Sequence, residues 1–203
     1  MFPGNLLRPI LLLSAFLLSA FLHVPAMAAD RVKVALKTDL GTITIAVEVK
    51  RAPITSANFL AYVDQKRFDG ETFYRAARNR NAPQYGLVQG GIDHKISRAL
   101  APIAHEPTSK TGLRHVDGTV SMARNEPGTA MGDFFIIVGQ GGSYLDAGPN
   151  GRPPGYAAFG HVVSGMEIVR KILALPTFRG GYSYETMGQS IRNRVKIIAA
   201  RRI

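Results

Sequence analysis

Hydrophobic residues alternate with polar or small ones over two neighbouring stretches, residues 32–37 and 42–49, with a turn at residues 39–41. Because successive strand side chains point to opposite faces, this pattern predicts a β-hairpin with one buried face. A helical period follows over Pro53–Asp64, where apolar residues recur every three or four positions. We expect this helix to end at residues 65–70.

Short apolar segments fill the middle of the chain, and each is too short for a helix. They are Thr72–Ala76, Leu87–Gly91, Thr119–Ala123, Phe134–Val138 and Ala157–Val163. A second helix is predicted at Met166–Leu173, before Pro176, and a final strand at Ile191–Ile198. Many short strands, a helix near each end and no strand–helix alternation predict a mainly β fold, a closed antiparallel β-barrel covered by two α-helices.

Two adjacent aromatic residues, Phe134 and Phe135, begin one of these strands. Neighbouring strand side chains face opposite ways, so the two rings cannot both enter the same core. One of them must face outward or into a second pocket. It would do so beside a loop that carries Arg124 and Asp133, which is the first indication of a binding surface.

The N-terminal residues 1–28 are similar to a secretory signal peptide. Arg8 precedes the apolar run Ile10–Leu22, and the small residues Ala26 and Ala28 suit a cleavage site. The run is short for a membrane span, and we favour cleavage over an uncleaved membrane anchor because no basic stop-transfer cluster follows until Arg31 and Lys33. We therefore expect an exported domain of residues 29–203 in the periplasm, which would touch a membrane only through an uncleaved signal peptide.

Composition limits the chemistry further. The 203 residues suffice for one domain with a full core. Zero cysteines exclude disulfides, thiolate catalysis and cysteine metal sites. The chain has 25 Lys and Arg against 14 Asp and Glu, a formal net charge of +11, which favours acidic partners in general without naming one.

Several short motifs in order resemble the cyclophilin-type peptidyl-prolyl isomerases. They are Pro53–Phe59, Phe73-Tyr74-Arg75, Val88–Gly91, Gly118–Ala123, Phe134-Phe135-Ile136 and Phe159-Gly160. Together they cover nearly all of residues 29–203. The resemblance implies an eight-stranded barrel filled by side chains, with an active site on its outer surface. It also implies an isomerase of X–Pro peptide bonds that needs no cofactor.

The chemistry of that reaction can be stated from first principles. Rotation about an X–Pro bond meets a barrier of roughly 20 kcal/mol, because planarity conjugates the nitrogen lone pair with the carbonyl. No nucleophile is required. An apolar surface for the proline ring helps, and so does a donor to the nitrogen once its lone pair is localised. Arginine is a permanently charged donor, and the resemblance gives that role to Arg75.

The resemblance also assigns other site residues. Gln89 would hold the substrate carbonyl and steady Arg75, and Phe135 would floor the proline pocket. The positions assigned to substrate binding are Tyr74, Leu87, Ala123, Arg124, Asp133, Tyr144, Leu145, Tyr156 and Phe159. In this set Leu87 and Leu145 are pocket walls, and the backbone at residues 123–124 would pair with an extended peptide.

Five positions depart from the family pattern. Tyr156 replaces a frequent histidine, and Tyr144 replaces a tryptophan that some relatives carry, so we expect weak binding of cyclosporin. Gly86, with Tyr85 beside it, stands where the family has an aromatic pocket wall. Arg124 and Asp133 replace a frequent asparagine and glutamine. Arg124 and Asp133 could pair with each other, or Asp133 could pair with Arg75, and the sequence leaves both ion pairs open. These departures also leave open a second function, that of a binding module or chaperone with little isomerase activity.

The histidines and Ser121 have simpler interpretations. His94, His105, His115 and His161 lack the close spacing of familiar zinc motifs, so we expect no metal site. Ser121 lacks the Gly-x-Ser-x-Gly context of a hydrolase nucleophile.

The terminal strands carry five cations that we expect to form one outward stripe away from the active site: Lys33, Lys37, Arg192, Arg194 and Lys196. A solvated strand face is favoured over a site for anionic polymer, and nucleic acid is not expected as a partner. The expected partners are proline-containing peptides and exported proteins that are unfolded or folding. We expect the protein to act as a monomer.

Overall fold

The computed structural model describes residues 30–203, so the predicted signal peptide lies outside the described residues. The strands are β1 (Val32–Thr38), β2 (Gly41–Val47), β3 (Thr72–Arg78), β4 (Gly86–Gly91), β5 (Thr119–Met122), β6 (Phe134–Val138), β7 (Ala157–Ser164), β8 (Thr177–Phe178) and β9 (Ser190–Arg202). The helices are α1 (Pro53–Asp64), α2 (Thr108–Thr111) and α3 (Met166–Ala174).

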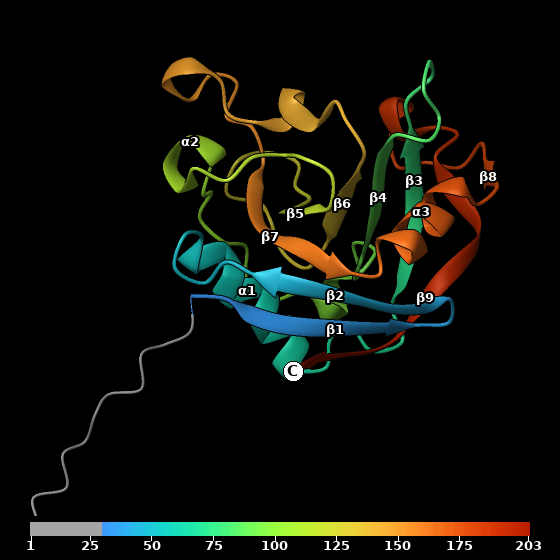
Figure 1. The fold of residues 1–203 in the computed structure, drawn as a ribbon, viewed down its shortest axis with the longest axis horizontal. Helices are drawn as coiled ribbons and strands as arrows, with labels where there is room; N and C mark the ends of the chain where they lie inside the picture. Colours follow the sequence, from blue (N-terminus) through green and yellow to red (C-terminus); the bar gives the residue numbers. More distant parts are fainter. Residues whose placement is uncertain (1–29) are drawn as a thin grey trace, which may run out of the picture.

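Eight strands close into an antiparallel barrel in the order β1-β2-β7-β5-β6-β4-β3-β9, and β9 pairs back onto β1. The two-residue strand β8 pairs only with β9 in the described sheet. Figure 1 shows β1 and β2 running side by side, with the C terminus close to α1. The predicted fold class is therefore confirmed, and α2 adds a third helix of a single turn.

The predicted elements match the observed ones closely, apart from the length of the last strand. It was expected to end at Ile198, but β9 continues to Arg202. The apolar alternation is lost over the last residues because Arg201 and Arg202 are both exposed and pair with Asp69 and Asp64. The strand continues there because residues 200–202 pair through their backbone with β1.

The barrel interior is filled by side chains, as expected for a small barrel. Phe59 of α1 packs against Phe68, Phe134 and Phe159, with ring centroids 4.9–5.5 Å apart. From the other helix, α3, four buried residues join the same core: Ile168, Val169, Ile172 and Leu173. No helix within residues 30–203 is long and apolar enough to cross a bilayer.

The two adjacent aromatics of β6 face opposite ways, as predicted. Phe134 lies in the main core inside the barrel. Phe135 belongs to a second, smaller cluster with Leu87, Ile137 and Leu145. This second cluster lies on the outer surface of the barrel and provides the floor of the site described next.

Candidate active site

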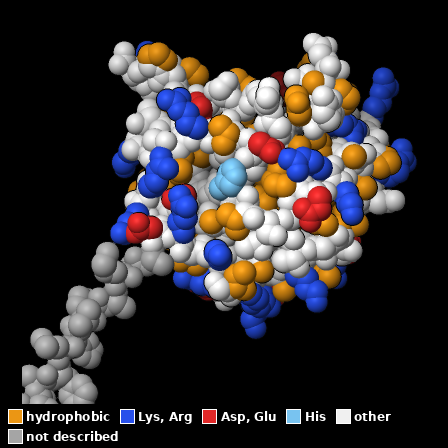
Figure 2. All heavy atoms as spheres, in the orientation of Figure 1, with side chains coloured by type: hydrophobic (Ala, Val, Ile, Leu, Met, Phe, Trp, Pro, Cys, Tyr) orange, Lys and Arg blue, Asp and Glu red, His pale blue; other side chains and the backbone are white. Residues whose placement is uncertain are grey.

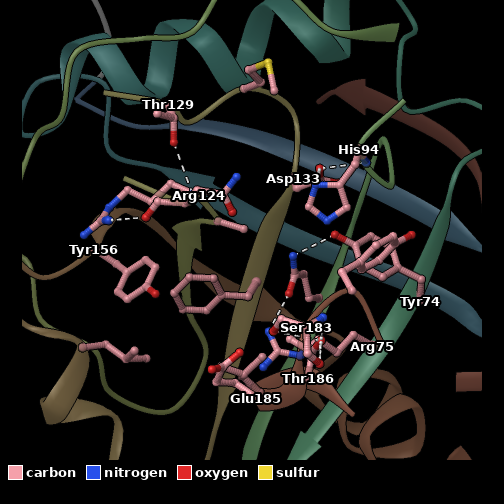
Figure 3. Close-up of a pocket in the computed structure, with 18 of the residues that line it drawn as sticks. Tyr74, Arg75, His94, Arg124, Thr129, Asp133, Tyr156, Ser183, Glu185 and Thr186 are labelled. Carbon is pink, nitrogen blue, oxygen red and sulfur yellow. Dashed lines mark hydrogen bonds and ion pairs between the residues drawn. The ribbon is translucent and has the colours of Figure 1, made fainter. Parts of the chain in front are cut away.

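A groove of about 460 Å³ opens above the second cluster. It contains eleven of the twelve residues that the sequence assigned to catalysis or substrate binding: Tyr74, Arg75, Leu87, Gln89, Ala123, Arg124, Asp133, Phe135, Tyr144, Leu145 and Tyr156. Figure 3 shows Arg124 and Tyr156 on one side of this groove and Tyr74, His94 and Asp133 on the other. The strands β3, β4 and β6 contribute Tyr74, Arg75, Leu87, Gln89 and Phe135, and the other six residues lie outside these three strands.

Phe159 is the exception, and its assignment to the groove was wrong. The side chain is fully buried in the main core, 4.9 Å from the Phe59 ring. Tyr156 and Phe159 are three residues apart, so in an extended chain they face opposite ways. Because Tyr156 faces the groove, Phe159 faces the interior.

A β-bulge in β3 places Tyr74 and Arg75 together. Phe73 pairs with Gly90 and Arg75 with Gln89, so Tyr74 is an extra residue without a partner of its own in β4. Phe73 and Ala76 consequently both enter the core. The two residues between them, which a regular strand would split between its faces, both line the groove.

Hydrogen bonds fix the Arg75 guanidinium at the edge of the apolar floor. Its Nη1 donates to Gln89 Oε1 at 2.8 Å, and its Nε donates to Gln189 Oε1 at 2.7 Å. Gln89 Nε2 in turn donates to the Tyr74 hydroxyl at 2.7 Å. Burial lowers the pKa of Arg75, but an arginine stays charged at neutral pH.

Asp133 makes neither of the two ion pairs considered from the sequence. Its carboxylate accepts hydrogen bonds from the backbone N–H groups of Asp93 and His94, at 2.8 and 3.1 Å. Burial raises the pKa of Asp133, and the nearby His94 opposes that effect. The backbone at Gly91 passes so close to this loop that a Cβ there would stand 2.3 Å from Gly132 O. Asp133 therefore holds the loop after β4.

Arg124 is turned toward the opposite wall. Its guanidinium donates to the backbone oxygens of Asn125 and Gly155 and lies 4.6 Å from the centre of the Tyr156 ring. The Tyr156 ring in turn packs edge-to-face on Phe135, with centroids 5.5 Å apart. Arg124 thus stiffens the tyrosine that replaces the family's frequent histidine.

The two remaining departures are Tyr144, at the rim of the groove, and Gly86, which is not among the residues that line it. Tyr144 is 73% exposed, and partial burial raises the pKa of its hydroxyl. Tyr85 does not replace the missing aromatic wall, since its ring packs on Gly139 and lines a separate hollow. Leu87, the residue after Gly86, does line the groove.

Sequence reasoning missed a whole segment of the groove. Tyr182, Ser183, Glu185 and Thr186 line it, and Gln189 contacts Arg75. The feature of the sequence that could have indicated this segment is a tyrosine-rich loop just before the last strand. Because β9 pairs with β3, that loop had to lie beside Arg75.

Ser121, His115 and Asp146 form a hydrogen-bonded chain behind the groove. His115 Nε2 lies 3.0 Å from Ser121 Oγ, and Nδ1 lies 2.7 Å from Asp146 Oδ1. Ser121 is fully buried, so it is closed to a substrate, and the His115 ring stacks at 6.0 Å on Phe135. Within residues 30–203, no three His, Cys, Asp or Glu side chains are arranged to hold a metal ion.

The five cations do not form one stripe away from the site, so that prediction was wrong. Lys37 pairs with Ala199 near the end of β9, whereas Arg194 lies beyond the part of β9 that reaches β1. Arg194 forms an ion pair with Asp93, and its guanidinium carbon lies 5.9 Å from the centre of the Tyr74 ring, at the border of the groove. Figure 2 shows basic side chains spread over the face that it draws.

Comparison with known proteins agrees with this geometry. A family described as cyclophilin type peptidyl-prolyl cis-trans isomerase/CLD matches residues 33–201. The chain belongs to this family. This cyclophilin is 34% identical over 175 residues to a peptidyl-prolyl cis-trans isomerase of Acinetobacter baylyi, a match that covers 84% of this chain and 87% of that protein. It is 38% identical to peptidyl-prolyl cis-trans isomerase A of Dickeya dadantii, over 75% of this chain and 77% of that one.

A solved structure has the same fold. A cyclophilin type isomerase of Cryptosporidium parvum, crystallised in the presence of the dipeptide Ala-Pro, superimposes with a TM-score of 0.66 at 18% identity. The match covers 84% of this chain and 98% of that chain. The enzyme class implied by the family resemblance, peptidyl-prolyl cis-trans isomerase, is confirmed by the family and its relatives.

Proposed function

We propose that this cyclophilin rotates X–Pro bonds in the groove over Phe135, with Arg75 as the catalytic donor. The observation that carries the proposal is the position of the Arg75 guanidinium, which two glutamines hold at the edge of an apolar floor. As the prolyl amide twists, its nitrogen regains a lone pair, and an N–H of Arg75 donates to it. That hydrogen bond is absent from the planar ground state, so it lowers the barrier.

The apolar floor supplies the rest of the catalysis. The proline ring would lie on Phe135 between Leu87 and Leu145, all three of which are buried in the second cluster. Removing water from the planar, charge-separated amide favours its twisted form. Gln89 would hold the substrate carbonyl. The Ala123 N–H already donates to Asp133 O at 2.9 Å, so the peptide would pair with the Ala123 carbonyl and the Arg124 backbone.

Exchange NMR on a short X–Pro peptide tests this assignment, using the full chain and the Arg75→Ala variant. A charged hydrogen bond contributes about 1.5–3 kcal/mol, so we expect the variant to be about 10- to 150-fold slower. Arg192→Ala is the matched control, since Arg192 is an exposed arginine of β9 that does not line the groove.

The outcomes separate two functions. Equal rates in the parent and in Arg75→Ala would refute Arg75 as the donor. Peptide binding without faster exchange in the parent would instead support a function as a chaperone with little isomerase activity. The low activity would then be attributed to the altered pocket wall near Gly86.

We further propose that the clients are exported proteins that fold in the periplasm. The support is the sequence of residues 1–28, with its apolar run and small residues before Ala29. Sequencing the N terminus of protein recovered from a periplasmic fraction tests this; recovery from the cytoplasm with Met1 intact would exclude it.

We also propose that cyclosporin binds weakly, because the exposed Tyr144 stands at the rim where some relatives carry a tryptophan. A low-nanomolar dissociation constant by calorimetry would contradict it.

A further inference from the structure

The turn before β9 reaches into the groove and contacts Arg75. We propose that Gln189, at the end of this turn, is a positioning residue that sets the orientation of the Arg75 guanidinium for catalysis. The inference rests on the proposed role of Arg75. Gln189 Oε1 accepts the Nε hydrogen of Arg75 at 2.7 Å, while Gln89 accepts from Nη1.

Two acceptors on different nitrogens fix the plane of the guanidinium, because rotation about its bond to the side chain would break one of the two hydrogen bonds. Gln89 alone would hold the group only on its Nη1 side and would leave the direction of the Nε–H bond unsupported. Within residues 30–203, Arg75 Nη2 donates to no protein group, so its hydrogens remain for a substrate. Gln189 therefore decides where the free donors of Arg75 point.

The Gln189 side chain is itself held from both ends of its amide. Its Nε2 donates to Glu185 O at 2.9 Å, which directs Oε1 toward Arg75. Its backbone oxygen accepts from Ala76 N at 2.9 Å, so Gln189 is tied to the residue that follows Arg75 in β3.

The turn is also rigid within itself. Ser183 N donates to Thr186 Oγ1 at 2.9 Å, and this hydroxyl donates back to Ser183 O at 3.0 Å. Gln189 N closes the turn on Thr186 O at 3.2 Å. In Figure 3 Ser183, Glu185 and Thr186 lie around Arg75. A glutamine on such a turn has a fixed side chain and loses little entropy when it binds the arginine.

Gln189→Leu tests the proposal, because leucine has a similar size and no acceptor. We expect kcat for an X–Pro peptide to fall about fivefold, as for one lost hydrogen bond of average strength, while KM stays within about twofold. A residue that only packed the turn would change KM and stability together. Met187→Ala is the control, since Met187 is 52% exposed in the same turn and does not line the groove.

NMR of the arginine Nε–H groups gives a readout that does not depend on activity. In the parent, the Arg75 Nε–H should exchange with water more slowly than that of the exposed Arg192, and its resonance should shift in Gln189→Leu. Equal exchange rates in the parent would overturn the proposal even if the variant failed to fold.

The two proposals fail in different ways. Unchanged kcat in Gln189→Leu, beside a slow Arg75→Ala, would overturn the role of Gln189 and leave that of Arg75 intact. A fast Arg75→Ala would overturn both.

Discussion

The β-bulge at Tyr74 determines which side chains of β3 point into the groove. As the extra residue of the bulge in β3, Tyr74 shifts Arg75 from the inward to the outward face. Its hydroxyl then accepts from Gln89 Nε2, and Gln89 Oε1 accepts from Arg75. A single inserted residue thereby both exposes the arginine and orients the glutamine that holds it.

His115 makes stability depend on pH. Burial behind Phe135 lowers its pKa below the usual 6.5, although Asp146 partly opposes this. Between pH 6.5 and the lower folded value, the unfolded chain binds the proton and the folded protein does not, so stability falls as the pH falls. We expect the melting temperature of the parent to drop more steeply from pH 7.5 to 5 than that of His115→Gln.

Asp133 acts in the other direction. Burial raises its folded pKa above 3.8, so its contribution to stability is present below that value and is lost as pH rises through the folded pKa. Both proteins retain Asp133, so its effect cancels in the difference between their melting curves. Parallel curves would show that His115 is not the group responsible.

The end of α3 depends on one arginine from β3. Arg78 Nη1 donates to Leu173 O and Leu175 O at 2.8 Å each, and Nη2 donates to Thr177 Oγ1 at 2.9 Å. Leu173 lies in the last turn of the helix and Leu175 comes directly after it, where backbone oxygens have no intrahelical partner. The contact joins α3 to the barrel wall.

Replacing Arg78 tests that junction. Arg78→Met keeps most of the apolar stem and removes all three hydrogen bonds, so we expect a loss of about 1.5–3 kcal/mol in the free energy of unfolding. Urea denaturation measures it, with Arg192→Met as the exposed control. Because Arg78 does not line the groove, turnover at low temperature should stay unchanged; a large fall in turnover would contradict this separation of roles.

At the level of elements, the pattern of apolar and polar residues predicts the strands and helices whose formation depends on short-range geometry. The alternation over β1 and β2 and the helical period over α1 depend on short-range geometry, and both were predicted correctly. The bulge at Tyr74 and the extension of β9 to Arg202 depend on which strand lies alongside. No period in the sequence reports those neighbours, so neither feature was predicted.

The same limit explains the site at the scale of the whole molecule. Motif residues on β3, β4 and β6 were found because the family resemblance identifies them one by one. Gln189 was missed because it meets Arg75 only through pairing of β9 with β3. The proposed ion pairs of Asp133 failed because two backbone N–H groups satisfied its carboxylate.

Closure of the barrel therefore connects stability to the site. Ala200, Arg201 and Arg202 pair with β1, and Ala200 is fully buried. Deleting residues 200–203 would leave the outer edge of β1 unpaired there and remove the partners of Asp69 and Asp64. The lost backbone hydrogen bonds and the buried methyl alone predict a fall of about 2–4 kcal/mol in unfolding free energy.

Urea denaturation of this deletion, beside deletion of Ile203 alone, measures the contribution of closure. Ile203 is 71% exposed and makes a single backbone hydrogen bond to Lys33 O, at 3.0 Å, so its loss should change stability little. Activity should fall with the larger deletion, because an open barrel frees β9 and with it the turn that carries Gln189. Equal stability of the two deletions would mean that pairing of β1 with residues 200–202 contributes nothing to stability.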